Sequence, residues 1–173
     1  MLRLLCAAGL RDAADIEAAM QRHADTVWRV CSLHLREPAD RQDAFQDAFL
    51  KYALADSTTF EDDEHCKAWL ITVTRNLCRD QLRRAARKNV SLDGLEGSEA
   101  TPVQADPAIQ PGSATSEVVA AMRALDDPPR TPLYLSIYEG YSAPEIASML
   151  DAPVNTVYSW ISRGRAQLRS ALS

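Results

Sequence analysis

Basic side chains recur at regular spacing in residues 75–88. Arg75, Arg79 and Arg83 lie four residues apart, so on a helix they form one stripe. Arginine binds phosphate or pairs bidentately with guanine, and the neighbouring Asn76 can pair with adenine. The segment holds six basic residues against one acid. This contrast favours contact with nucleic acid over the alternative of a solvated basic face.

Residues 142–169 are a second candidate binding segment, with the pattern of two helices joined by a tight turn. Ser142 and Glu145 have the spacing of a capping box, which predicts a helix start. Pro153 disfavours helical backbone in the residue before it, so that helix should end at 151–153. The next helix has an expected inner stripe of Val154, Val157, Ile161 and Leu168.

The outer side of this second helix is polar. It carries Asn155, Thr156, Ser159 and Arg163. A capped helix, a tight turn and a helix with polar outer residues is the helix-turn-helix plan for reaching a DNA major groove. An ordinary helical hairpin is the alternative interpretation.

The elements that carry these residues are predicted to be all α-helical. Apolar residues follow helical spacing near residues 12–36, from Pro38 onward, and near 65–88, 116–125 and 131–139. Gly and Pro interrupt any repeat between them from residue 89. We therefore expect two small helical domains, an N-terminal bundle at 1–88 and a C-terminal helix-turn-helix domain at 115–173, joined by a flexible acidic linker at 89–114.

The net charge of −5 is unusual for a protein that binds DNA. The charge is unevenly distributed, because residues 89–127 hold seven acids and one basic group while 152–173 hold three arginines and no acid. Duplex affinity depends largely on counterion release, so the whole chain should bind DNA poorly by itself. This indicates a protein that a larger partner delivers to DNA.

Several other kinds of site find little support. The four cysteines are widely spaced without a CxxC pair, which favours buried thiols over a disulfide framework or a zinc site. An enzyme using His65, Cys66 and nearby carboxylates lacks a catalytic arrangement or phosphate loop. No catalytic residue, metal or cofactor is predicted. With no segment long enough for membrane insertion, we expect a cytoplasmic protein.

Three motifs, in this order, resemble the sigma-70 family of RNA polymerase sigma factors, in its compact extracytoplasmic-function (ECF) group. Residues 43–49 resemble the family's polymerase-clamp-binding signature. Residues 68–80, with Trp69 expected to be structural, resemble the segment that handles the melted minus-10 promoter element, and 138–168 resemble the domain that reads the minus-35 element.

The resemblance implies a factor that binds core RNA polymerase and directs promoter recognition, promoter melting and transcription initiation. It assigns polymerase binding to Asp43, Gln46 and Asp47. It assigns melted minus-10 DNA to Arg75, Asn76, Arg79, Arg83 and, in the loop 56–66, Phe60. It assigns double-stranded minus-35 DNA to Asn155, Thr156, Tyr158, Ser159 and Arg163.

An anti-sigma factor is a further candidate partner. The alternative function is a free-standing helix-turn-helix regulator whose N-terminal bundle dimerises or senses a signal. The sequence also departs from the family in three places. The loop is unusually acidic at 61–64, Cys66 stands where Phe is usual, and Tyr158 and Trp160 occupy positions that are often Lys and Arg.

Overall fold

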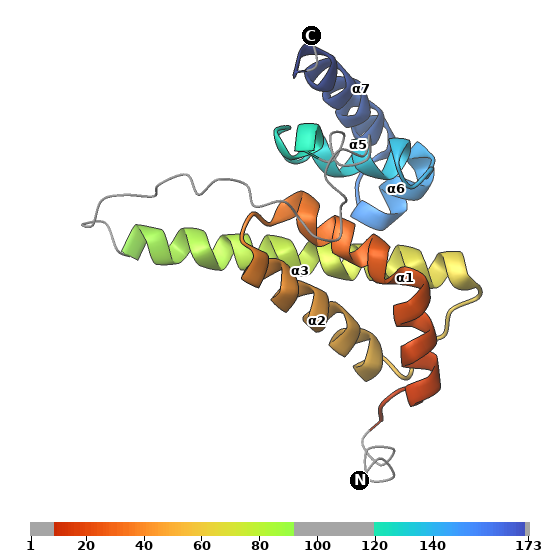
Figure 1. Ribbon diagram of the computed structural model, residues 1–173. Helices are drawn as coiled ribbons and strands as arrows, with labels where there is room; N and C mark the ends of the chain where they lie inside the picture. The colour runs from red at the N-terminus through yellow and green to blue at the C-terminus, as the bar shows by residue number, and fades with distance from the viewer. Residues whose placement is uncertain (1–8, 92–119, 172–173) are drawn as a thin grey trace. The chain divides into compact units, whose positions relative to one another are not determined.

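The structure, a computed structural model, describes residues 9–91, without the side chains of 88–91, and residues 120–171. Throughout these ranges the regular elements are helices, as predicted (Figure 1). The chain divides into two compact units, 1–104 and 105–173. Residues 92–114 of the predicted linker and Cys6 fall outside the described residues, while residues 89–91 continue the preceding helix. The domain boundaries at 88/89 and 114/115 stay predictions.

The first unit consists of α1 (Ala13–His34), α2 (Pro38–Leu54) and α3 (Asp63–Ser91), each packed against the other two (Figure 1). Pro38 opens α2, where its missing N–H is tolerated. Acidic residues in the first turn of α3 favour the positive end of the helix. The long α3 thus gives the unit one continuous helix that runs from the core to a basic end.

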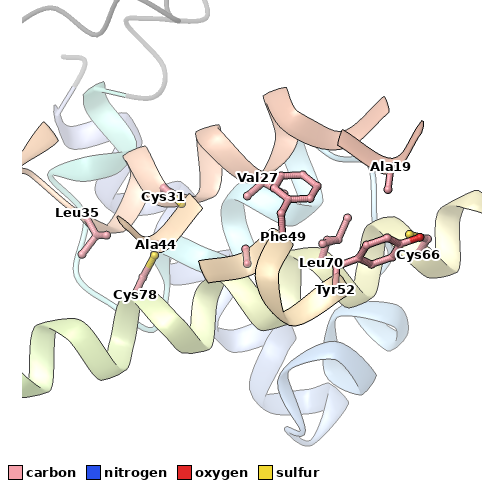
Figure 2. Packing of buried hydrophobic residues seen from close by; sticks show 11 residues of the cluster. Ala19, Val27, Cys31, Leu35, Ala44, Phe49, Tyr52, Cys66, Leu70 and Cys78 are labelled. Carbon is pink, nitrogen blue, oxygen red and sulfur yellow. The ribbon is translucent and has the colours of Figure 1, made fainter. Parts of the chain in front are cut away.

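The core of this unit fills the space between the three helices (Figure 2). Phe49 and Tyr52 of α2 meet Val27 of α1 and Leu70 of α3 there. Its members are Ala19, Val27, Cys31, Leu35, Ala44, Ala48, Phe49, Tyr52, Cys66, Leu70 and Cys78. Trp69 packs against this cluster, which confirms its predicted structural role.

Three cysteines, Cys31, Cys66 and Cys78, are buried and free, as expected. Burial raises the pKa of the Cys66 thiol. The hydrogen bond with Cys78, and then burial, raise the pKa of Cys31. Reactivity belongs to the thiolate, so these side chains act as small apolar core residues.

The second unit contains helical residues 120–123, α5 (Arg130–Ile137), α6 (Ala143–Leu150) and α7 (Val154–Ala171). The capping box predicted at the start of α6 is present. The Ser142 backbone N–H donates to Glu145 Oε2 at 2.8 Å, and the Glu145 N–H donates to Ser142 Oγ at 3.5 Å. Ser142 Oγ also donates to Glu145 Oε2 at 2.6 Å, and this bond, followed by that of the Ser142 backbone N–H, lowers the pKa of the Glu145 carboxyl.

The turn after α6 has the predicted position. Asp151 adopts the left-handed conformation, with φ of 50°, and the Ala152 N–H donates to the Ala147 carbonyl at 3.0 Å. Both features end a helix and redirect the chain. Because α7 then begins at Val154, two helices joined by a three-residue turn form the expected helix-turn-helix.

The inner stripe of α7 differs from the prediction at Val154, which is 37% exposed. The helix packs instead along a line through Val157, Ile161 and Gly164, which are buried, and Val154 lies at the edge of that line. Gly164 has a specific role, because a Cβ there would lie 3.1 Å from Leu133 Cδ2 of α5. The absence of a side chain allows α5 and α7 to approach closely.

Candidate nucleic-acid interface

The basic stripe of α3 changes from buried to exposed along its length. Arg75 is 8% exposed, Arg79 is half-buried, and Asn76 and Arg83 are exposed. Cys78 is the last fully buried residue described in α3, and residues 82–87 are all exposed. The exposed basic surface is therefore made by the later part of the stripe, and Arg75 differs from it in lying inside the unit.

The loop between α2 and α3 is tied down by Arg11, which the sequence analysis did not single out. The Arg11 Nε donates to the Tyr52 carbonyl at 3.1 Å, and another guanidinium nitrogen donates to the Thr58 carbonyl. The guanidinium also lies 4.6 Å from the centre of the Tyr52 ring and 4.9 Å from that of Phe60. No sequence spacing could have revealed a contact between such distant positions.

Phe60 is half-buried in an aromatic cluster at the base of this loop. Its ring is stacked on Tyr52, with centroids 5.9 Å apart, and meets Trp69 edge-on at 5.7 Å. His65 approaches it edge-on at 5.5 Å. Phe60 thus packs against the core, and its assignment to melted DNA stays a prediction.

The acidic residues of the loop have structural partners. The Asp62 carboxylate accepts the His65 N–H at 2.7 Å at the start of α3. Asp63 lies 3.3 Å from the Arg22 guanidinium and 3.1 Å from His23 Nε2, both on α1. These bonds give two of the four carboxylates a role in closing the loop on α1 and α3. The sequence alone showed an unusually acidic loop and did not reveal that role.

The exposed face of α2 carries the residues assigned to polymerase binding. Asp43, Gln46 and Asp47 are all exposed, and the buried residues of α2 lie on its other side. Leu50 and Leu54 continue the same face and are 55% and 56% exposed. Sequence analysis missed these two leucines, although their spacing of three and four residues from Asp47 and Leu50 was a usable signal.

The outer face of α7 presents most of its predicted DNA-binding residues. Asn155, Tyr158, Ser159 and Arg163 are exposed, while Thr156 is half-buried. Ser159 Oγ donates to the Asn155 carbonyl at 3.0 Å. Trp160, the other aromatic substitution, is half-buried.

Two further kinds of site were sought in the structure. Over residues 9–91 and 120–171, no three His, Cys, Asp or Glu side chains gather as a metal site would require. In the same part of the chain, no helix has the length and hydropathy of a membrane span.

Both units match known families. Residues 19–88 match Sigma-70 region 2, and residues 115–168 match Sigma-70 region 4. The first match contains the α2 and α3 surfaces, and the second contains the helix-turn-helix. All thirteen predicted site residues lie within one or the other.

Curated relatives extend over most of the chain. The ECF RNA polymerase sigma factor SigM of Mycobacterium tuberculosis is 32% identical over 170 residues, covering 98% of this chain and 83% of its own length. The ECF RNA polymerase sigma factor EcfG of Rhodopseudomonas palustris is 29% identical over 144 residues, covering 83% and 78% respectively.

Solved structures share the fold. The sigma factor RpoE from Bartonella quintana, in complex with the anti-sigma factor NepR, superposes with a TM-score of 0.75 at 24% identity. That match covers 91% of this chain and 96% of the other. CnrH, in complex with the cytosolic domain of CnrY, superposes with a TM-score of 0.60 at 24% identity. That match covers 93% of this chain and 89% of CnrH.

Proposed function

The chain belongs to the ECF group of the sigma-70 family of RNA polymerase sigma factors, and from this premise we propose which surfaces carry out its work. A sigma factor binds core RNA polymerase and directs it to promoters, where transcription begins. One observation supports the assignment of surfaces most directly. The chain that carries an exposed basic end on α3 also carries a capped helix-turn-helix.

Core RNA polymerase docks on the exposed face of α2. Asp43 and Asp47 supply negative charge, which steers association with a basic partner surface. Leu50 and Leu54 extend that face with apolar area that a partner would remove from water. The charged groups on this helix face would speed association with core polymerase, and the apolar groups would strengthen the complex.

Paired substitutions test this docking surface. The double variant Asp43→Ala/Asp47→Ala should bind core polymerase more weakly than the wild type. Its affinity should also fall less steeply as the salt concentration rises. Asp25→Ala, an exposed acid on α1, is the matched control. Equal affinities for all three proteins, measured by fluorescence anisotropy against core enzyme at two salt concentrations, would contradict the proposal.

Melted minus-10 DNA lies along the exposed part of α3. Arg79 and Arg83 offer cations to the phosphates, and Asn76 offers an amide that can pair with an unstacked adenine. Arg75, being buried, would support this surface from inside the unit. Arg11 and Phe60 fix the loop before the first turn of α3, at the other end of that helix.

The minus-10 assignment predicts a separation between binding and opening. Asn76→Ala and Arg79→Ala should impair open-complex formation and leave polymerase binding intact. Permanganate reactivity of promoter thymines reports opening, with Arg36→Ala as an exposed basic control. Normal opening by both variants would refute these two assignments.

The outer face of α7 reads the minus-35 element in the major groove. Asn155, Tyr158 and Ser159 are placed for base edges, and Arg163 for phosphate or a further base. Thr156 contributes at the margin of this face. Loss of one such base contact costs about 1–3 kcal/mol, enough to rank promoters.

The protein adds no catalysis of its own in this account, and it acts in the cytoplasm together with polymerase. A free-standing regulator is not favoured, because both sigma regions are matched in one chain. A wild-type protein that binds promoter DNA alone but does not co-elute with core polymerase would reverse that preference. An anti-sigma factor is a proposed partner, since the solved neighbour RpoE was captured with the anti-sigma factor NepR.

A further inference from the structure

The first half of α7 has an unusual surface for a helix that enters DNA. Residues 154–162 include no charged side chain, and the arginines of the helix begin at Arg163. Recognition helices contact base edges mainly through their N-terminal residues. The part of α7 that meets the bases is therefore electrically neutral.

Two apolar side chains are exposed on this neutral half. Val154 is 37% exposed and Tyr158 is 56% exposed, and they lie one helical turn apart. Neither position is needed for the core, which α7 joins through Val157, Ile161 and Gly164. Exposed apolar groups on a binding face are suited to an apolar partner atom.

Few polar groups lie beside these two side chains, and one of them already forms a hydrogen bond within the helix. Ser159 Oγ donates its proton to the Asn155 carbonyl, so that hydroxyl can only accept from a base. The Asn155 side chain keeps both a donor and an acceptor, the combination that matches adenine N6 and N7. Guanine presents only acceptors in the major groove and is most often read by Arg or Lys, which this half lacks.

We propose that the first half of α7 reads A·T base pairs in the minus-35 element, through the thymine C5-methyl group. Val154 and Tyr158 pack against thymine methyls, and Asn155 pairs with the edge of an adenine. The inference rests on the proposed minus-35 role of α7 and adds its chemical specificity. Val154 is a new specificity-determining residue in this reading.

The decisive perturbation removes one methyl group from the DNA. Promoters are first selected from a library randomised at the minus-35 element, using polymerase holoenzyme containing the full chain. Each thymine of the selected element is then replaced by deoxyuridine, which keeps the base pair and loses only the methyl. Burial of one methyl-sized group corresponds to about a fourfold change in binding, so we expect a loss of that size at contacted positions.

Protein variants identify which side chain meets which methyl. Val154→Ser and Tyr158→Ser should each abolish the deoxyuridine effect at one position and leave it at others. Ile137→Ser, which removes an apolar group of 48% exposure outside α7, is the matched control and should keep every effect. Holoenzyme assembly and circular dichroism verify that each variant folds. The wild-type deoxyuridine series tests the proposal even if a variant does not fold.

The outcomes separate this inference from the function on which it rests. Selection of guanine at the positions that α7 contacts, or full tolerance of deoxyuridine, would overturn thymine readout while leaving a functional sigma factor. Retention of every methyl effect in both serine variants would also overturn it. Initiation by the holoenzyme with no selection at any randomised position would instead reject the minus-35 role itself.

Discussion

Replacement of Gly164 by alanine has two physical effects, which change the stability of the second unit in opposite directions. Alanine is favoured over glycine inside a helix by about 0.8–1.0 kcal/mol, so propensity alone predicts a more stable second unit. The Cβ of alanine would, however, lie 3.1 Å from Leu133 Cδ2, 3.2 Å from Leu133 Cβ and 3.2 Å from the Pro129 carbonyl oxygen. Carbon atoms prefer about 3.5–4.0 Å, so all three contacts are compressed.

The steric effect should exceed the propensity effect. The Leu133 Cβ and the Pro129 oxygen are fixed to the backbone, so a rotamer change cannot relieve them and α5 must move away from α7. Overpacking of this kind costs about 1–3 kcal/mol. After subtraction of the propensity gain, we expect Gly164→Ala to destabilise the second unit by about 1 kcal/mol.

Hydrogen exchange of the full chain can resolve this unit from the other, since it reports the opening free energy of each helix. Amides of α5 and α7 should exchange faster in Gly164→Ala. Ala166→Gly, at an exposed position of α7, measures the propensity effect within the same helix and should cost about 1 kcal/mol. Slower exchange in Gly164→Ala would refute the close-packing argument.

Four further predictions concern other parts of the structure. Phe60→Ala removes a half-buried ring packed on the core, so it should destabilise the first unit by less than the about 3–5 kcal/mol that a fully buried Phe costs, and Phe60→Leu should cost less again; urea unfolding of both variants checks this. Ser142→Ala should cost about 0.5–2 kcal/mol through loss of the α6 cap, measured by hydrogen exchange of α6 amides, with Ser148→Ala as an exposed control inside the helix. Because folding lowers the pKa of Glu145, the ionised carboxylate stabilises the folded second unit at pH values above its ordinary pKa of 4.5. This stabilisation is lost as the pH falls through the pKa of the folded state, and Glu145→Gln should remove that pH dependence of stability. In a Cys6→Ser background, the remaining cysteines should resist alkylation until the protein unfolds, and rapid labelling of the native protein would contradict their burial.

Local signals in the sequence predicted the elements well. The Ser142 and Glu145 spacing located the start of α6, and Pro153 located its end, because capping and proline chemistry act within a few residues. Helical periodicity from Pro38 onward predicted the helix that became α2. These features depend on neighbours along the chain, which the sequence displays directly.

Tertiary packing decided the rest. Arg75 and Arg83 have the same type and share one stripe, yet only Arg83 is exposed, because burial decreases along α3 after Cys78. Val154 fitted an apolar period and still lies outside the core, which α7 joins through Val157, Ile161 and Gly164. Periodicity gives a direction around a helix but not where along its length a neighbour ends.

The two candidate DNA surfaces differ in the kind of recognition that their chemistry allows. On α3, the exposed groups include several cations in one helix end, which suits the phosphates and unstacked bases of a melted strand, where charge and position matter more than base edges. The first half of α7 is neutral and partly apolar. Such a surface suits discrimination between base pairs in an intact major groove and contributes little to the affinity for DNA. A chain built in this way depends on core polymerase to hold both surfaces on DNA, which agrees with its net negative charge. Cationic substitution at Tyr158 should therefore raise affinity for any duplex and reduce the ability of α7 to tell one promoter from another.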